Sequence, residues 1–256
     1  MNVLRVLKKI PPPIIPAVIG LLLLELLTRT RVMNPFLIPP PTEVAMALIE
    51  QRSALIHATL NTVHGAVAGF AISAVVGIGL AVALSSSRWI QAAFYPYAVF
   101  FQTVPIVAIA PLLVIWFGND IDAVIASACI VSVFPIIANT LSGLLSTDQA
   151  LKELFILYRA SKWATLFKLR LPFALPAILV GLRVGAGLAV IGAIVGEFVS
   201  TGSGLGGLIT VARQRQQVEI VFAALILSAC VGIAMFAAIN VMSRVALRHW
   251  HASEKS

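Results

Sequence analysis

Long apolar segments separated by short polar stretches dominate the pattern of this chain. A helix that crosses a membrane needs about 20 consecutive, mostly apolar residues. Six segments approach that requirement, so the pattern predicts an all-α, polytopic membrane protein with six transmembrane helices. The predicted spans are Ile14–Leu27, Thr62–Leu84, Ile90–Phe117, Ile121–Leu145, Phe173–Val199 and Val218–Leu247.

The third predicted span is too long for one straight helix and contains Pro96, Pro105 and Pro111. Each proline removes a backbone donor and clashes with the preceding turn. We therefore expect a kinked helix, or a half-buried piece that leads into a span. Inside a membrane such breaks persist only where protein or a cavity covers the freed carbonyls. The stretch from Gln102 to Pro111 is thus either part of a solute pathway or a simple packing kink.

Composition supports lipid as the solvent of most of the chain. Of its 256 residues, 60% are hydrophobic and only 11% are charged, against about half and a quarter in soluble domains. The net charge of +8 could indicate nucleic-acid binding, but the basic residues are spread over short segments between apolar runs. That distribution is typical of loops facing an anionic lipid surface, so we predict contact with membrane lipid and no nucleic acid. Cys129 and Cys230 lie inside apolar runs, which favours packing roles rather than a disulfide or a metal site.

The loops are unequal in Lys and Arg, and cytoplasmic loops carry the excess. With the N-terminus inside, the inner set is Arg5, Lys8, Lys9, Arg88, Lys152, Arg159, Lys162, Lys168, Arg170, Arg244, Arg248 and Lys255. The outer set is Arg29, Arg31, Arg52, Arg213 and Arg215, and Arg183 lies within the fifth span. The asymmetry predicts a multi-pass protein of the bacterial cytoplasmic (inner) membrane with both termini in the cytoplasm.

The loop from Ser146 to Pro172, between the fourth and fifth spans, has the pattern of folded helix. Asp148 can cap one short helix and Ser161 a second, which would carry Trp163. Leu154, Leu157 and Tyr158 recur at helical spacing in the first. An amphipathic helix in a polar loop indicates either a docking surface for another protein or a helix lying on the lipid interface.

The same loop resembles the EAA motif of ABC importer permeases, which reads Glu-Ala-Ala, three residues, Gly, nine residues, then Ile-x-Leu-Pro. The matching residues are Glu153-Leu154-Phe155, Arg159-Ala160-Ser161 and Leu169-Arg170-Leu171-Pro172, and the spacing fits without a gap. The resemblance implies a coupling helix that binds the ATP-binding subunit through Glu153, Leu154, Tyr158, Arg159, Ala160, Ser161, Leu171 and Pro172.

Further segments between residues 37 and 210 are similar to the nitrate/sulfonate/taurine/bicarbonate branch of these permeases. They include Leu37-Ile38-Pro39-Pro40-Pro41, Val104-Pro105, Ile115-Trp116-Phe117-Gly118, Asn139-Thr140, Gly181-Leu182-Arg183, Gly196-Glu197 and Gly204-Leu205-Gly206. The family resemblance implies a type I importer permease fold in which residues 1–256 form a single transmembrane domain, with a coupling loop at about 146–172. It also implies a homodimer of permeases, two ATP-binding cassette subunits, and a periplasmic or lipid-anchored solute-binding protein.

No Gly-Lys-Ser or Gly-Lys-Thr occurs, so the chain has no P-loop. We expect no cofactor in this chain and no enzymatic activity, with ATP and Mg bound by the partner ATPase. Two rival functions are an ATP-independent secondary transporter or channel and an intramembrane enzyme. The docking loop and the shortage of intramembrane carboxylates argue against the first, and the lack of a nucleophile–base motif argues against the second.

One departure from the motif concerns the glycine position, which is occupied by Arg159. If the backbone there is left-handed, arginine costs on the order of 1 kcal/mol. The backbone could instead stay right-handed, with Arg159 meeting a carboxylate on the ATPase.

Residues inside the predicted spans give a second set of candidates, for the substrate pathway: Gln102, Pro105, Asn139, Arg183 and Glu197. Glu197 is either a solvated or helix-anchoring acid or a residue near the outer gate. Arg183 could attract an anion, or extend inward and pair with a loop acid. The substrate stays open between a small anion, such as nitrate, a sulfonate, taurine or bicarbonate, and a pyrimidine or aromatic compound.

Gly202 to Gly207 formally satisfies the dinucleotide pattern G-x-G-x-x-G. No strand precedes it, so we interpret it as a flexible or re-entrant outer loop.

Overall fold

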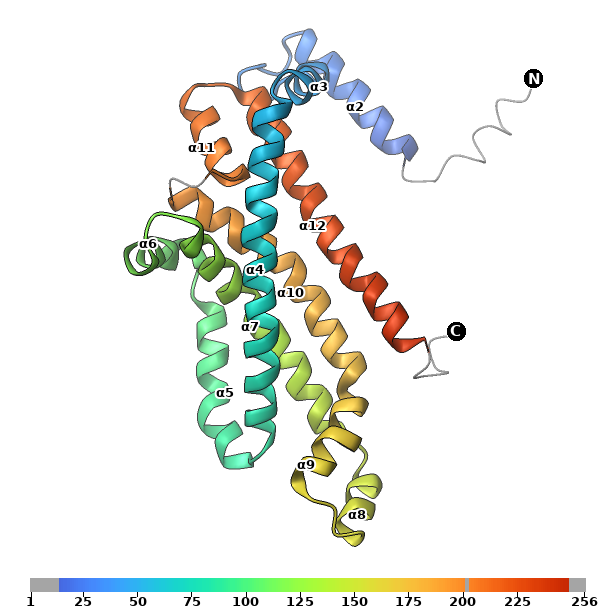
Figure 1. The fold of residues 1–256 in the computed structure, drawn as a ribbon. Helices are drawn as coiled ribbons and strands as arrows, with labels where there is room; N and C mark the ends of the chain where they lie inside the picture. The colour runs from blue at the N-terminus through green and yellow to red at the C-terminus, as the bar shows by residue number, and fades with distance from the viewer. Residues whose placement is uncertain (1–13, 201–202, 249–256) are drawn as a thin grey trace, which may run out of the picture.

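The computed structural model describes residues 14–200 and 203–248, and every regular element in that part of the chain is a helix. Four long helices form the centre of the molecule: α4 (Arg52–Ser85), α7 (Ile121–Leu145), α10 (Leu171–Val199) and α12 (Val218–Leu247) (Figure 1). Each is long and apolar enough to cross a membrane, α10 together with the helical residues from Lys162 that precede it. The all-helical membrane fold predicted from the sequence is therefore confirmed.

Helix α7 packs between α4 and α10, and small residues set the close approach. A Cβ atom on Gly69 of α4 would lie 2.5 Å from the Cβ of Ala128 on α7. A Cβ atom on Gly192 of α10 would lie 2.6 Å from the carbonyl oxygen of Ser127, also on α7. Such contacts replace the hydrophobic driving force that is missing in lipid. Gly69 and Gly192 thus lie where α7 contacts α4 and α10 most closely.

The predicted third span consists of two helices, α5 (Arg88–Thr103) and α6 (Ile106–Phe117). They are separated at Val104, whose backbone is extended, and Pro105 precedes the first residue of α6. Pro96 and Pro111 lie inside the two helices, so only Pro105 ends one. The expected break is confirmed, and its position follows from the bias of a residue before proline toward extended backbone.

The predicted first span corresponds to α2 (Ile14–Arg29), which has 16 residues and is shorter than a full membrane crossing. It lies beside α3 (Pro41–Glu50), away from the central helices (Figure 1). Glu25 of α2 accepts hydrogen bonds from the backbone N–H of Thr42 (3.1 Å) and from its hydroxyl (2.8 Å). Four described helices, not six, meet the length of a span, because α2 is short and the third segment is divided.

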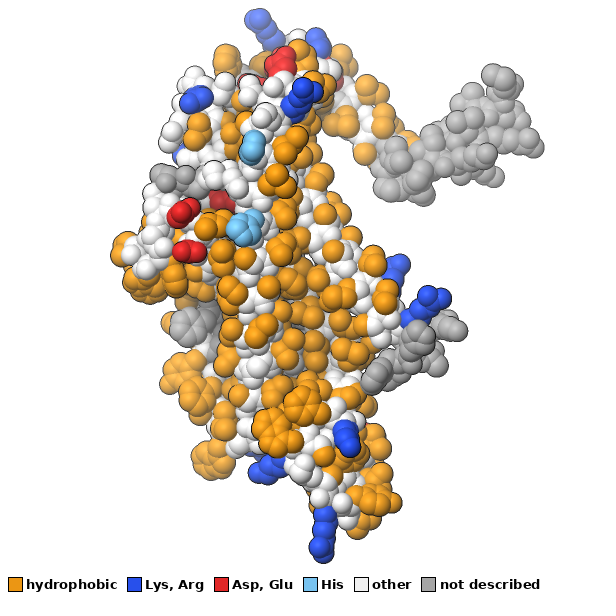
Figure 2. Space-filling view, viewed as in Figure 1, with side chains coloured by type: hydrophobic (Ala, Val, Ile, Leu, Met, Phe, Trp, Pro, Cys, Tyr) orange, Lys and Arg blue, Asp and Glu red, His pale blue; other side chains and the backbone are white. Residues whose placement is uncertain are grey.

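Short helices lie at opposite ends of the bundle. At one end are α8 (Gln149–Leu157), α9 (Lys162–Thr165) and the π-helix η1 (Leu166–Arg170), and near the other is α11 (Leu205–Gln214) (Figure 1). Hydrophobic side chains cover the middle of the face in Figure 2, and Lys and Arg gather toward the two ends and beside the end of α12. Both chain termini, with Arg5, Lys8, Lys9 and Lys255, lie outside the described residues.

Candidate coupling loop and solute pathway

Helix α8 begins and ends where local sequence dictates. The carboxylate of Asp148 accepts a hydrogen bond of 2.7 Å from the backbone N–H of Ala150, which caps the helix. At the other end, the N–H of Arg159 donates to the carbonyl of Ile156 and that of Ala160 to the carbonyl of Phe155, both at 2.9 Å. This pair of bonds is the Schellman motif that closes many helices.

Arg159 has φ of +51°, so its backbone is left-handed. Of the two alternatives drawn from the sequence, the structure selects the left-handed one. Glycine would adopt this conformation without the clash between Cβ and the following carbonyl oxygen. Arg159 therefore has the left-handed backbone conformation that glycine adopts most easily, at the glycine position of the motif.

The second short helix also begins at its predicted cap. The hydroxyl of Ser161 accepts a hydrogen bond of 3.1 Å from the backbone N–H of Ala164. Trp163 and Phe167 stack with ring centroids 5.9 Å apart and planes 17° apart. Both rings are exposed, so the stacked pair forms part of the exposed apolar surface of the loop.

The loop presents apolar side chains that the chain itself does not cover. No residue of α8 is buried. Leu157 is 79% exposed and the capping residue Tyr158 is 78% exposed. Glu153 is exposed too, and its carboxylate accepts a hydrogen bond of 3.1 Å from the Gln149 amide. Contiguous apolar exposure of this kind marks an interaction surface.

The loop joins the bundle through η1 and the first turn of α10. Leu171 and Pro172 open α10 and are half-buried, and Leu166 and Leu171 pack against the buried side chains of Leu144 and Ile178. Arg170, predicted only as one of the inner basic residues, donates four hydrogen bonds of 3.2–3.3 Å to the backbone carbonyls of Ser85 and Leu144.

A pocket of about 320 Å³ lies where α5 gives way to α6. Its lining residues come from α5, α6, α7 and α10, and they are Gln102, Thr103, Val104, Pro105, Ile106, Ile130, Val131, Phe134, Pro135 and Leu188. Two pathway candidates, Gln102 and Pro105, thus line a cavity. Their role in transport stays a prediction.

Asn139 and Arg183 are not among the residues that line this pocket. The Asn139 amide donates a hydrogen bond of 2.8 Å to the carbonyl of Pro135, one turn earlier in α7. The guanidinium carbon of Arg183 lies 6.0 Å from the centre of the Phe236 ring on α12, a cation–π arrangement. The expected pairing of Arg183 with a loop acid is not found among the described residues, where the only ion pair joins Arg29 and Glu25.

Glu197, near the C-terminal end of α10, is 2% exposed and therefore not solvated. One carboxylate oxygen accepts hydrogen bonds from the hydroxyl of Thr62 on α4 (3.0 Å) and from the backbone N–H of Gly206 on α11 (2.8 Å). The Thr62 oxygen accepts a further bond of 2.8 Å from the N–H of Leu205. Gly204, the N-cap of α11, has no side chain to do this, so residues of two other helices cap α11.

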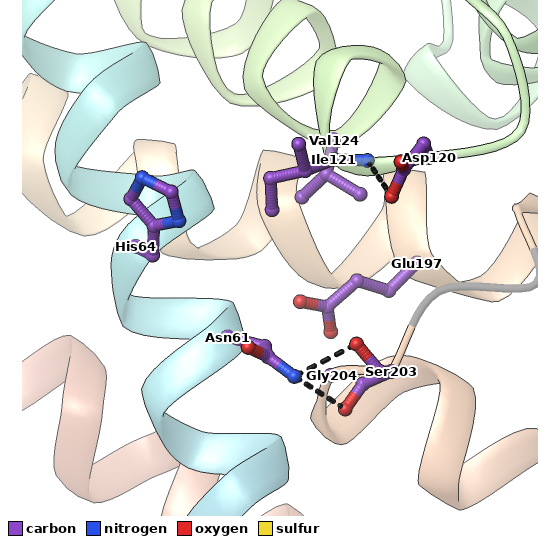
Figure 3. A pocket seen from close by; sticks show the side chains of 8 residues that line it. All are labelled: Asn61, His64, Asp120, Ile121, Val124, Glu197, Ser203 and Gly204. Carbon is purple, nitrogen blue, oxygen red and sulfur yellow. Dashed lines mark hydrogen bonds between the residues drawn. The ribbon is translucent and has the colours of Figure 1, made fainter.

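Beside this contact lies a pocket of about 160 Å³, lined by Asn61, His64, Asp120, Ile121, Val124, Glu197, Ser203 and Gly204 (Figure 3). The Asn61 amide donates to the hydroxyl of Ser203 at 2.7 Å and to its carbonyl at 3.2 Å, as the dashed lines show. Of the two interpretations of residues 202–207, a flexible or a re-entrant loop, the flexible one is wrong for the described part: from Leu205 the chain is helical, and Leu205, Gly206 and Gly207 are buried. Gly202 lies outside the described residues.

Thr62, Asn61 and Arg170 carry contacts that the sequence did not reveal. The first two lie more than 130 positions before their partners, so no local spacing indicates the pairing. Arg170 occupies the variable position of Ile-x-Leu-Pro, where the motif itself carries no signal. Its only signal in the sequence is that it is the last cation before an apolar span.

The described helices define an all-helical membrane protein with an exposed loop at one end of the bundle. Residues 73–248 match the family described as "Binding-protein-dependent transport system inner membrane component", and the chain belongs to this family. The family predicted from the sequence is thereby confirmed. Permeases of this family act in general with a solute-binding protein and a separate ATPase.

Relatives with described transport roles match over most of the chain. The formylaminopyrimidine transport permease protein ThiX of Halalkalibacterium halodurans is 35% identical, over 84% of this chain and 86% of that protein. The putative aliphatic sulfonates transport permease protein SsuC of Bacillus subtilis is 29% identical, over 94% of this chain and 87% of its own length. An inward-facing structure of the MetNI methionine ABC transporter aligns with a TM-score of 0.66 at 17% identity, covering 77% of this chain and 97% of that chain. This last likeness shows the importer-permease fold.

Proposed function

We propose that two copies of this chain form the membrane path of an ATP-driven importer, and that each loop 146–172 docks one ATP-binding subunit. The observation that carries the proposal is the apolar surface of α8 and α9, which is folded, locally capped and uncovered. A helix lying on the lipid interface, the alternative from the sequence, fits less well. The loop projects at the end of the bundle beyond the end of α4 (Figure 1).

In this proposal ATP is bound and hydrolysed by the partner, and this chain supplies the moving path. Closure of the two ATPases displaces the docked loops, and each loop displaces α10, which continues from η1 without a gap in the helical residues. Alternating access then follows from a change in population between two arrangements of the bundle, because the ATPase binds one arrangement more tightly.

A second copy is required in this proposal because one chain supplies only parts of a path. The pocket of about 320 Å³ and the pocket of about 160 Å³ share no lining residue, so together they do not form a channel through the bundle. Isologous dimers are the commonest oligomers, and a path on the two-fold axis would be lined equally by both copies. Chemical cross-linking of the purified permease should give a dimer.

For the substrate we propose a small, uncharged heteroaromatic solute of the pyrimidine type. The described lining of the larger pocket carries Gln102, Thr103 and the Phe134 ring but no cation. Arg183, the cation considered for anion binding, lies at Phe236 instead. The 35% identical ThiX is described as a formylaminopyrimidine permease, which supports this class over small oxyanions.

The docking role is tested with Glu153→Gln in the complete transporter. Glu153 is exposed, and among the described residues its carboxylate accepts a hydrogen bond only from Gln149, so the variant should fold and enter the membrane normally. We expect it to lose co-purification with the ATPase and ATP-driven uptake. Glu50→Gln, an exposed acid of α3 near the opposite end, is the matched control and should transport normally. Unchanged uptake by Glu153→Gln would contradict the coupling role.

The substrate class is tested on the co-encoded solute-binding protein. Ligand binding to the folded state raises the melting temperature by mass action. We expect a rise with formylaminopyrimidine and none with ethanesulfonate or bicarbonate. A rise only with the anions would overturn the substrate proposal and leave the docking proposal intact.

A further inference from the structure

Arg170 connects the coupling loop to two helices of the bundle at once. Its Nε and Nη2 atoms donate to the carbonyl of Leu144 at 3.3 and 3.2 Å. Its Nη1 and Nη2 atoms donate to the carbonyl of Ser85, both at 3.3 Å. Ser85 is the last residue of α4, and Leu144 lies in the last turn of α7. The side chain is half-buried between the two helix ends.

Two helix C-termini make an appropriate site for a single guanidinium group. The last four carbonyls of a helix lack partners within it, and the aligned peptide dipoles leave that end partly negative. The planar guanidinium carries its donors in a rigid fork, so one arginine can bind two acceptors that lie apart. The only ion pair among the described residues is elsewhere, between Arg29 and Glu25, so these carbonyls are the partners that the structure gives Arg170.

The element that carries Arg170 is unusual. Residues Leu166–Arg170 form a π-helix between α9 and α10. Turns of this kind are rare and often occur at functional positions. A wide turn directly between the docking surface and α10 is a place where movement of the loop could be absorbed rather than passed on.

We propose that Arg170 is the positioning residue that transmits movement of the coupling loop to α4 and α7 together with α10. This inference rests on the proposed docking of an ATPase on the loop. The contact at Ser85 also reaches α5, which begins three residues later at Arg88 and ends at the larger pocket. Loss of the Arg170 contacts leaves the ATPase docked but separates its movement from the pocket.

The experiment uses the full complex of permease, ATPase and solute-binding protein in liposomes. Cys129 and Cys230 are replaced by alanine, and His57→Cys places one spin label per permease near the outer end of α4, where His57 is exposed. The probe is ATP with vanadate, which holds the ATPase closed. The measured quantity is the label-to-label distance distribution in the dimer, together with the rate of ATP hydrolysis.

We expect the parent complex to shift to a new distance. Arg170→Met should bind the ATPase and hydrolyse ATP normally but lower the shifted fraction about tenfold, because hydrogen bonds from a charged donor are among the stronger ones in proteins. Lys168→Met, which removes an exposed cation from the same π-helix, should behave like the parent. A full shift in Arg170→Met would overturn the inference, and so would a loss of ATPase binding in parallel with the shift.

A second variant covers failure of the first to assemble. Arg170→Lys keeps the charge, but one ammonium group cannot reproduce four bonds to two helix ends, so its shifted fraction should also fall. A full shift in Arg170→Lys would refute the inference without reference to the methionine variant. Absence of any shift in the parent complex would instead count against the proposed function.

Discussion

The two loops that flank α10 contrast sharply. The loop before it contains α8, and the loop after it contains α11. Both short helices end in a Schellman motif around a left-handed residue that is not glycine, Arg159 with φ +51° and Gln216 with φ +60°. No residue of α8 is buried, whereas five residues of α11 are. The same C-terminal motif therefore ends one helix that is exposed and one that is packed into the bundle.

The difference lies in where each helix obtains its N-cap. Asp148 caps α8 from the adjacent position, so the N-cap of α8 needs no residue of the bundle. The first N–H groups of α11 are bound by Thr62 and Glu197, which belong to α4 and α10. Because α8 is capped by its own loop, its surface is free to bind a partner. Because α11 is capped by residues of α4 and α10, it is part of the membrane core.

The largest difference in stability is expected when one acid is removed from the contacts of each loop, Glu197 for α11 and Glu153 for α8. Glu197→Ala leaves the N–H of Gly206 without its buried acceptor, and the Thr62 hydroxyl keeps only the Ala58 carbonyl. Together with the cavity left by the side chain, this should lower the free energy of unfolding in detergent by about 4 kcal/mol. Glu153→Ala removes an exposed acid and should change stability by less than about 0.5 kcal/mol. Denaturant titration of both variants measures the difference.

Glu197→Gln serves as the control, because its amide oxygen can still accept the Gly206 bond. It should lose clearly less stability than Glu197→Ala. Equal losses in the two variants would mean that the carboxylate group, which both variants remove, accounts for the effect rather than the hydrogen bond to Gly206.

The next largest effects are expected when one leucine of each short helix, Leu205 of α11 and Leu157 of α8, is replaced by alanine. Leu205 of α11 is 0% exposed, so Leu205→Ala should destabilise the permease by about 3 kcal/mol and leave ATPase binding unchanged. Leu157→Ala should have the reverse effect, with normal stability and ATPase binding weakened by about 2 kcal/mol. Thermal unfolding and titration with the purified ATPase separate the two. A destabilised Leu157→Ala would show that α8 is packed on the bundle.

The sequence predicts the loop before α10 far better than the loop after it. The caps at Asp148 and Ser161 and the exposed face of α8 depend on neighbours within four positions, which local spacing encodes. The contacts of Glu197 depend on helices brought together by folding, so only the cost of burying a carboxylate indicated that the residue was special. The length of the apolar segments, which is also local information, predicted the long helices, but it did not predict the number of spans where proline divides a segment.

Removal of the N-cap of α8 tests whether this helix unfolds separately from the bundle, and its effect should be smaller. Asp148→Ala should cost α8 about 1 kcal/mol, because the N–H of Ala150 loses its acceptor. Since α8 does not pack on the core, the loss should appear as faster amide exchange in residues 149–157 with no change in denaturant titration of the bundle. A fall in global stability would show that α8 unfolds together with the membrane helices.

The smallest effect concerns the two left-handed residues. Glycine relieves a strain of about 1 kcal/mol at such a position but gains freedom in the unfolded chain, so Arg159→Gly should stabilise its helix by about 0.5 kcal/mol net. The same holds for Gln216→Gly. If the comparison is right, the first substitution slows amide exchange only in α8, while the second raises the stability of the whole bundle, because α11 is buried in it. ATPase affinity then decides the role of the arginine itself: a weaker complex with Arg159→Gly means that the guanidinium binds the partner, and an unchanged one means that only the shape of the backbone matters there.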